Sequence, residues 1–290
     1  MREVALDAPL GDERHDADPP TLALCERVAD MFDMEAAVFL PSGTMCNEIA
    51  IAVHTRLGDE VICTRESHII FAESGGPAAL SGVMMCPVDG ERGMLTSKDL
   101  SDRIRPPSSH APRSRLLVVE QTANLAGGAV WPVSQINDVA KAAKTAGLAT
   151  HLDGARILNA QVATGIPAAD YARDFDSAWI AFTKGLGCPV GAVLAGSKDF
   201  IKEAWLHKRR WGGAMRQTGV LTAMCLYALD NHVERLAEDH ALAQRIGAQL
   251  SKLPTIADVL PVETNIVIAT LSETAPDAFE TDDDGTGLGL

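Results

Sequence analysis

Residues 148–184 read LATHLDGARILNAQVATGIPAADYARDFDSAWIAFTK, and this stretch decides the fold. It contains two apolar runs, 148–153 and 178–182, separated by a segment long enough for a helix. The first run ends on Asp153, and Lys184 follows the second, 31 residues later, a spacing that fits a strand–helix–strand crossover. We therefore predict parallel strands that present a carboxylate and an amine at the edge where open α/β sheets bind their ligands.

The same alternation of short apolar runs and helix-like stretches extends over the rest of the chain. It is typical of an α/β fold with a mostly parallel sheet, and the chain contains no internal repeat. Helices are predicted at 21–32, 45–55, 133–146, 197–210 and 219–250, the last with a break near Asn231. Strands are predicted at 36–40, 61–63, 83–86, 116–120, 148–153, 178–182, 191–195 and 265–270.

The composition excludes several classes of protein. The 290 residues are 47% hydrophobic and 22% charged, which is typical of one large globular domain or two unequal ones. The net charge of -14 argues against a nucleic-acid-binding protein, which needs a basic face. No apolar run approaches the roughly 18 residues of a transmembrane helix, and residues 1–4 do not begin an apolar signal sequence. We therefore expect a cytoplasmic protein that binds neither membranes nor nucleic acid.

The cysteines give no sign of a metal or redox site. None of them forms a C-x-x-C pair, so neither a zinc ribbon nor a thioredoxin-type dithiol is expected, and no metal site is predicted. In a cytoplasmic protein we expect reduced, buried thiols. The six are Cys25, Cys46, Cys63, Cys86, Cys188 and Cys225.

Polar residues directly follow two of the predicted strands and open possible binding loops. After 36–40, the sequence Ser42-Gly43-Thr44 opens a helix whose free N–H groups suit a phosphate, although helix capping by Ser42 or Thr44 is the simpler interpretation. After the run ending at Leu152, Asp153 and Arg156 offer a carboxylate and a cation, which could also belong to an ordinary turn.

Lys184 and His68 complete a set with one chemical use. A buried Lys184 would lose part of its preference for the ammonium form and become a nucleophilic amine, unless its side chain reaches solvent. His68 follows 61–63, where a single histidine is more often structural. Taken together, a phosphate-binding helix start, an imidazole, a carboxylate and a lysine are what pyridoxal 5'-phosphate requires. The lysine would hold the cofactor, and the carboxylate would keep its ring nitrogen protonated.

Five ordered motifs resemble the low-specificity L-threonine aldolase family, within the aromatic amino acid beta-eliminating lyase group. The resemblance runs from about residue 11 to residue 270. It implies a fold-type I PLP-dependent transferase-like (aspartate aminotransferase-like) large domain with a mostly parallel sheet. The motifs are Phe39-Leu40-Pro41-Ser42-Gly43-Thr44, His68 with Glu73-Ser74-Gly75-Gly76, His151-Leu152-Asp153-Gly154-Ala155-Arg156, Phe182-Thr183-Lys184-Gly185-Leu186-Gly187 and Gly213-Ala214-Met215-Arg216-Gln217.

The resemblance implies a pyridoxal phosphate-dependent carbon–carbon lyase. Such an enzyme cleaves L-threonine, L-allo-threonine or a related β-hydroxy-α-amino acid to glycine and an aldehyde by a retro-aldol step. Gly43 and Thr44, with Ser42 beside them, would bind the cofactor phosphate. Among the remaining motif residues, His68 would stack on the ring near the substrate hydroxyl, Asp153 would pair with the ring nitrogen, and Lys184 would be the Schiff-base lysine.

Two arginines receive roles from the same resemblance. Arg156 would lie near the cofactor 3-hydroxyl and the substrate carboxylate. Arg216 would reach the phosphate of a neighbouring subunit's cofactor, because family members are homotetramers built from dimers with shared active sites. We therefore expect self-association as a dimer or tetramer.

Three departures from the family pattern leave other functions open. Ala123 stands where many members carry a histidine, so the base for the substrate hydroxyl is His68, a water or another group. The chain starts after the family's Arg-Ser-Asp segment, and no arginine follows Arg245. We expect a large domain at 1–240 and an incomplete small domain with an acidic tail at 241–290. The alternatives are a truncated cofactor-binding protein with weak or no activity, or a β-eliminating lyase or transferase.

Overall fold

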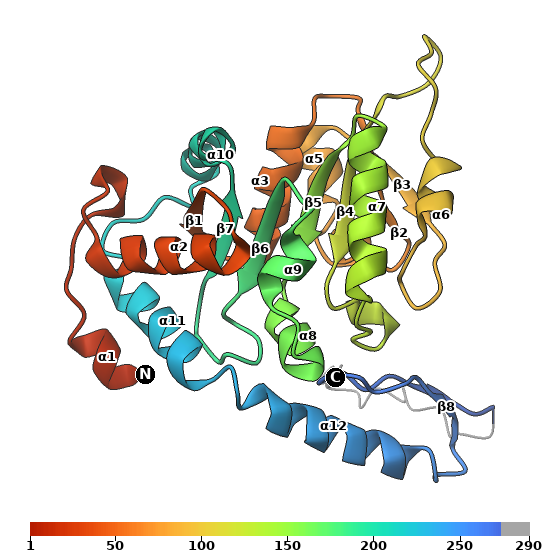
Figure 1. Cartoon of the computed structure of the whole chain (residues 1–290). Helices are drawn as coiled ribbons and strands as arrows, with labels where there is room; N and C mark the ends of the chain where they lie inside the picture. The colour runs from red at the N-terminus through yellow and green to blue at the C-terminus, as the bar shows by residue number, and fades with distance from the viewer. Residues whose placement is uncertain (274–290) are drawn as a thin grey trace, which may run out of the picture.

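Seven strands form one sheet in the structure, a computed structural model that describes residues 1–273 (Figure 1). Their order across the sheet is β1-β7-β6-β5-β4-β2-β3. Strand β7 runs antiparallel to both of its neighbours, and the other pairs are parallel, so the predicted mostly parallel sheet is confirmed. The strands are β1 (Ala36–Leu40), β2 (Glu60–Thr64), β3 (Met84–Val88), β4 (Ser114–Glu120), β5 (Ala149–Asp153), β6 (Ser177–Ala181) and β7 (Ala192–Gly196).

The central strands bury side chains on both faces of the sheet. In β1, Phe39 joins the core on one face, whereas Val38 and Leu40 join the core on the other. In β6, Ile180 and Trp179 divide in the same way. Because both faces are covered, these strands read as continuous apolar runs, which is the pattern that predicted them.

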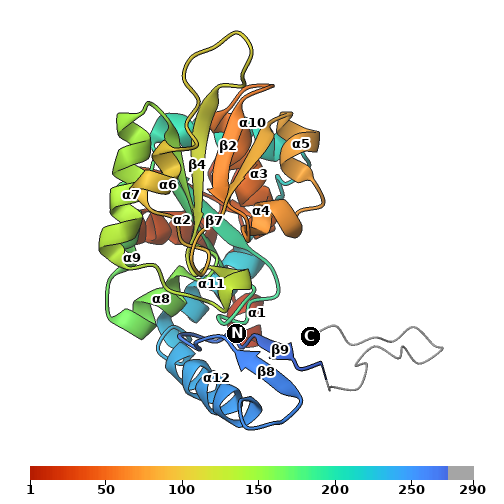
Figure 2. The ribbon, with the colours of Figure 1, turned by 90° about the vertical axis from the view of Figure 1, so that its right-hand side faces the viewer.

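Two layers of helices enclose the sheet. In Figure 2, α7 lies on one side of the strands, and α3 and α5 lie on the other. Helices α2 and α9 share the core of α7, and α10 packs against α3. The helices are α1 (Arg2–Leu6), α2 (Pro19–Phe32), α3 (Gly43–His54), α4 (His68–Phe71), α5 (Gly76–Ser81), α6 (Ser97–Ser101), α7 (Val133–Thr145), α8 (Ile157–Thr164), α9 (Ala168–Ala172), α10 (Lys198–Arg210), α11 (Gly219–Asn231) and α12 (Leu236–Leu250).

The predicted helices are confirmed to within two residues at each end, including the break after Asn231. Side-chain caps explain where several of them begin. Asp18, Ser42 and Ser197 accept hydrogen bonds from backbone N–H groups in the first turns of α2, α3 and α10, respectively. Proline at the start of α2 supplies a fixed φ where no N–H is needed.

The last predicted strand, 265–270, is largely wrong. Only Ala269–Leu271 forms a strand, β9, which pairs antiparallel with β8 (Ile256–Val259) beside α12 (Figure 2). The preceding residues instead run along the loop after β4. There the Thr264 hydroxyl donates to the carbonyl of Gly128, and the Asn159 amide donates to the Asn265 side chain. Tertiary contacts therefore override the apolar pattern of this segment.

Several other expectations have mixed outcomes. All six cysteines are free thiols, but only four are buried as expected, and Cys25 and Cys86 are partly exposed. None of the helices among residues 1–273 is long and apolar enough to cross a membrane. The domain division at residue 240 stays a prediction, and the acidic tail lies outside the described residues.

A buried ion pair joins the N-terminal segment to the body of the protein. The Lys208 ammonium on α10 lies 2.6 Å from a Glu13 carboxylate oxygen, and both side chains are at most 1% exposed. The other Glu13 oxygen accepts a hydrogen bond from the backbone N–H of Met215. Lys208 also lies 4.1 Å from the ring of Trp205. Glu13 thus holds the start of the chain against α10 and the loop that follows it.

We expect Glu13→Ala to destabilise the fold by about 3–5 kcal/mol, because it leaves the Lys208 charge buried without its partner. The free energy of unfolding in urea measures this loss. Glu26→Ala, on the exposed surface of α2, is the matched control and should change little. The double variant Glu13→Ala/Lys208→Met should recover much of the loss; if it does not, the ion pair is not the source of the effect.

Candidate active site at the carboxyl ends of the strands

The candidate site is a cavity of about 190 Å³ at the carboxyl edge of the parallel strands. Asp153 and Glu120 are the last residues of β5 and β4, and they are register partners, so their carboxyl groups lie side by side. Lys184 enters from the loop after β6. The prediction that the charged residues after different strands meet at one edge therefore agrees with the structure.

Six of the eight predicted site residues line this cavity. They are Gly43, Thr44, His68, Asp153, Arg156 and Lys184.

The other two predicted residues make different contacts. Ser42 caps α3 by accepting a hydrogen bond from the backbone N–H of Met45. Arg216 forms an ion pair of 2.6 Å with Asp12 and is half exposed. The proposed contacts of Ser42 and Arg216 with the cofactor stay predictions.

Asn47 connects two buried acids beneath the cavity. Its side-chain amide nitrogen donates to Oδ2 of Asp153 and to Oε1 of Glu73, each at 2.8 Å. The second oxygen of Asp153 accepts from the backbone N–H of Ala155. Asn47 is fully buried, and it stands one turn after Gly43 on α3. The first turn of α3 therefore lines the cavity, and its second turn fixes the acids below.

The orientation of Asn47 is set by donors on its other side. Trp179 Nε1 donates to the Asn47 carbonyl oxygen at 2.7 Å, and His151 Nε2 donates to it at 3.2 Å. The Ser177 hydroxyl in turn donates to His151 Nδ1 at 2.8 Å. Burial lowers the pKa of His151 to about 3, so the ring stays neutral. Two donors on the oxygen leave the amide N–H groups to the two acids.

His68 begins α4, and two carboxylates hold it. Its Nδ1 donates to Oε1 of Glu73 at 2.8 Å, and its backbone N–H donates to Oε2 of Glu120 at 3.0 Å. The hydrogen bond to Glu73 raises the pKa of His68. With Nδ1 engaged, Nε2 is the ring nitrogen left for chemistry in the cavity.

Burial shifts the charged groups of the site toward their neutral forms. It raises the pKa of Asp153, and it raises that of Glu120 to about 7. It also lowers the pKa of Lys184, with the nearby Arg156 charge as the second cause. Arg156 donates to the Asn124 side chain at 3.1 Å, while its buried Nε has no hydrogen-bond partner among the described residues.

Glycine is required at position 43 by close packing. A Cβ atom there would lie 2.2 Å from the ring of Trp179, which is itself buried. The start of α3 thus approaches β6 as closely as backbone allows. This approach leaves the backbone at the helix start open to the cavity.

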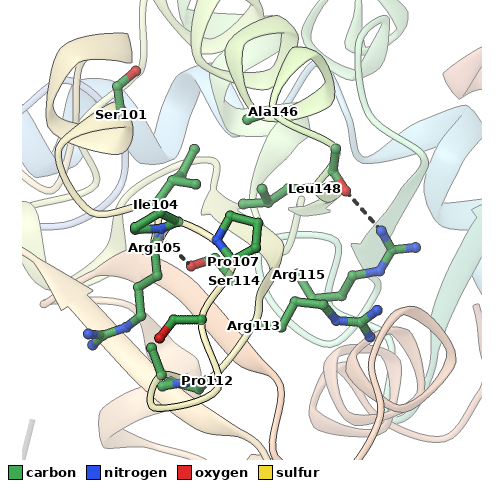
Figure 3. Close-up of a pocket in the computed structure, with 14 residues that line it drawn as sticks. Ser101, Ile104, Arg105, Pro107, Pro112, Arg113, Ser114, Arg115, Ala146 and Leu148 are labelled. Atoms are coloured by element: carbon green, nitrogen blue, oxygen red, sulfur yellow. Dashed lines mark hydrogen bonds between the residues drawn. The ribbon is translucent and has the colours of Figure 1, made fainter.

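A larger cavity, about 700 Å³, lies at the opposite, amino edge of the sheet. Figure 3 shows the guanidinium groups of Arg113 and Arg115 on one side of it and that of Arg105 on the other. These groups already have partners in Asp59, in the Gly147 carbonyl and in Glu60, respectively. The cavity has walls rich in proline, and it lacks the acid, imidazole and amine that meet at the carboxyl edge.

Sequence reasoning missed roles for Asn47, Glu73 and Glu120. Glu120 could have been found, because it ends a predicted strand as Asp153 does. Asn47 gives only the weak signal of a polar residue one turn after Gly43. Ala123, the departure from the family pattern, packs in a small apolar cluster with Ala126 and Ala129 and supplies no polar group.

Comparisons with known proteins agree with this geometry. Residues 1–274 match the beta-eliminating lyase family. The low specificity L-threonine aldolase of Escherichia coli K12 is 38% identical over 94% of this chain and 81% of its own length. The corresponding enzyme of Saccharomyces cerevisiae is 34% identical over 93% of this chain and 70% of its own length.

A solved structure shows the same fold. The threonine aldolase of Leishmania major matches with a TM-score of 0.73 at 24% identity, over 87% of this chain and 73% of that one. The fold-type I architecture expected from the motifs is thereby confirmed. The chain belongs to the beta-eliminating lyase family and, within it, to the low-specificity L-threonine aldolase family that its motifs predict.

Proposed function

We propose that the protein is a pyridoxal phosphate-dependent aldolase. It cleaves L-threonine, L-allo-threonine or a related β-hydroxy-α-amino acid to glycine and an aldehyde. The observation that carries this proposal is the convergence of Lys184, Asp153, His68 and Arg156, from three separate segments, on one cavity. The identity with named L-threonine aldolases over most of the chain supports the same reaction.

The residues present fit the cofactor. Burial raises the pKa of Asp153, so its carboxylate form needs a nearby cation to be stable, and a protonated ring nitrogen would supply that cation. The buried Nε of Arg156 has no acceptor among the described residues, and a phenolate or carboxylate oxygen of a ligand would accept its hydrogen bond. The start of α3 at Gly43 and Thr44 offers N–H groups to a phosphate. Lys184 would attach the cofactor through its amine.

When bound, pyridoxal phosphate draws the electrons of the breaking Cα–Cβ bond into its ring. The residues of the site hold the substrate so that the Cα–Cβ bond, and no other bond to Cα, has the orientation in which its electrons can enter the ring. Arg156 binds the substrate carboxylate. Asp153, fixed by Asn47 and the Ala155 N–H, keeps its charge against the ring nitrogen.

His68 is the group that moves the proton of the substrate hydroxyl. Its Nδ1–H is held by Glu73, so Nε2 accepts the proton as the bond to the β-carbon breaks. The raised pKa of His68 increases its strength as a base. Ala123 has no group for this task, which leaves His68 as the imidazole that lines the cavity.

Product analysis tests the proposed reaction. Purified protein is incubated with L-threonine, L-allo-threonine and phenylserine, and the products are identified. Glycine with the matching aldehyde supports the aldolase. A keto acid would instead indicate β-elimination, and cofactor binding without turnover would indicate a binding protein.

Finer assignments form part of the same proposal. We propose a cytoplasmic homotetramer in which Arg216 contacts the cofactor phosphate of a neighbouring subunit. Its planar guanidinium suits a phosphate, and its side chain, half exposed in the ion pair with Asp12, is accessible to a neighbouring subunit.

We expect Lys184→Ala to abolish covalent attachment of the cofactor. The wild-type protein should be yellow, and borohydride reduction should fix pyridoxal phosphate to the peptide that contains Lys184, as read by mass spectrometry. Lys202→Ala, an exposed lysine on α10, is the control and should behave as the wild type. A reducible adduct that persists in Lys184→Ala would place the cofactor on another lysine.

We expect Asp153→Asn to lower kcat by about a thousandfold or more, roughly 4 kcal/mol of barrier, because a neutral ring is a poor electron acceptor. The fold should persist, since the substitution keeps the side-chain volume and leaves an oxygen for one of the two donors, Asn47 or the Ala155 N–H. Steady-state kinetics and far-UV circular dichroism check both points. Asp138→Asn, exposed on α7, is the control. A loss below about tenfold, 1.4 kcal/mol, would refute the role of Asp153.

A further inference from the structure

A third buried acid, Glu48, stands directly behind the site and has no role in the reaction described above. It follows Asn47 on α3, is 2% exposed, and neither of its carboxyl oxygens has a donor among the described residues. Its side chain lies within hydrogen-bonding reach of Glu73. Oε2 of Glu73 is likewise buried without a donor. Two orphaned acids in contact cannot both be carboxylates without a large electrostatic cost.

One shared proton resolves this arrangement. Oε1 of Glu73 already accepts hydrogen bonds from two donors, Asn47 Nδ2 and His68 Nδ1, so Glu73 acts as the acceptor in this cluster. The proton therefore belongs to Glu48. Its O–H then donates to Oε2 of Glu73 and satisfies the remaining orphaned oxygen.

The backbone leaves space for this carboxyl group and no more. A Cβ atom at Gly76, the first residue of α5, would lie 2.0 Å from Oε1 of Glu48 and 2.6 Å from its carboxyl carbon. No positive φ requires glycine at this position. The absence of a side chain at Gly76 is thus explained by the room that Glu48 occupies.

We propose that Glu48 is a positioning residue that acts through Glu73: its carboxylic acid donates a hydrogen bond to Glu73 and so fixes the acceptor that orients His68. The chain of contacts is Glu48 to Glu73 to His68 Nδ1, which leaves His68 Nε2 directed to the cavity. Asn47 ties the same Glu73 to Asp153. Loss of the Glu48 proton would place two negative charges side by side and disturb this alignment.

The groups around Glu48 define when this proton is lost. Burial, reinforced by Glu73, raises the pKa of Glu48 to about 8. Helix α5 and strands β1, β6 and β7 contribute no ionisable side chain to the surroundings of α3. The other elements packed on α3 do carry ionisable residues, but among the described residues the only charged neighbour that shifts the pKa of Glu48 is Glu73. These residues are Arg115 and Glu120 of β4, His151 and Asp153 of β5, and Lys198, Asp199, Lys202, Glu203, His207, Lys208, Arg209 and Arg210 of α10, of which Lys208 is paired with Glu13.

Two substitutions separate hydrogen bonding from mere space filling. Glu48→Gln keeps a donor, because its amide can donate to Oε2 of Glu73, but it cannot titrate. Glu48→Met has similar volume and no donor. Glu234→Gln, on the exposed surface, is the control. Gly76→Ala provides an independent route, because its methyl group must displace the Glu48 carboxyl group.

The first readout needs no turnover. In the apoprotein, NMR of labelled histidine follows the titration of His68. We expect wild type to show a second inflection near pH 8, from Glu48, which Glu48→Gln lacks while its His68 pKa stays raised. Glu48→Met and Gly76→Ala should lower the His68 pKa, because a Glu73 side chain without its Glu48 contact moves away from His68 Nδ1 and weakens the hydrogen bond that raises this pKa.

The effect on turnover rests on the proposed function. Glu48→Gln should keep kcat within about threefold at neutral pH and extend activity to higher pH, whereas Glu48→Met should lower kcat about tenfold with a smaller change in KM. If the NMR behaves as expected and no aldolase activity exists, the proposed reaction fails and the positioning role stands.

Two results would overturn the positioning role. One is a His68 titration that is the same in wild type, Glu48→Gln and Glu48→Met. The other is a loss in Glu48→Gln as large as that in Glu48→Met. If Glu48→Met does not fold, infrared spectroscopy decides. Wild type at pH 7 should show a protonated carboxyl band that Glu48→Gln lacks, and equal spectra would refute the proposal.

Discussion

The side-chain amide of Asn47 is the contact on which the site depends. Its oxygen accepts from Trp179 and His151, and its nitrogen donates to Asp153 and Glu73. A side-chain amide has an oxygen that accepts and a nitrogen that donates. Two donors at the oxygen of Asn47 therefore fix the direction in which its nitrogen points. A single group on α3 thereby sets the position of the acid from β5 and, through Glu73, the imidazole of α4. In a buried setting, each of these bonds would be costly to leave unmade.

Much of this architecture could be predicted from the sequence, and the reason is physical. Strands covered on both faces are continuous apolar runs, and the residues that end them meet at one edge, so the sequence pattern places Asp153 and Lys184 at the edge where the structure has them. The breaks between helices carry local signals, such as the caps Ser42 and Ser197. Such features depend on a few neighbouring residues, and they need no knowledge of the tertiary fold.

The features that could not be predicted depend on contacts between distant segments. Glu48 and Glu73 are 25 residues apart in the chain. No local sequence pattern near either residue predicts that Gly76 leaves the space in which their side chains meet. The segment 265–268 has a strand-like pattern, but Thr264 and Asn265 bond to the loop at Gly128 and to α8 instead. Apolar periodicity reports burial, and it does not say which neighbour provides it.

The charges of the site explain why a ligand would complete the fold. Burial raises the pKa of Asp153 and Glu120 and lowers that of Lys184, so acids and amine are all driven toward neutrality. A ligand with a protonated nitrogen beside Asp153 would give that buried carboxylate a partner and favour its charged form, while the neutral amine that burial favours at Lys184 is the form that attacks a carbonyl group. Ligand bound only to the folded state adds about 2.7 kcal/mol of stability at a concentration 100 times its Kd. The unpaired buried carboxylate of Asp153 is thus a source of affinity for a cationic ligand, which would act as part of the core.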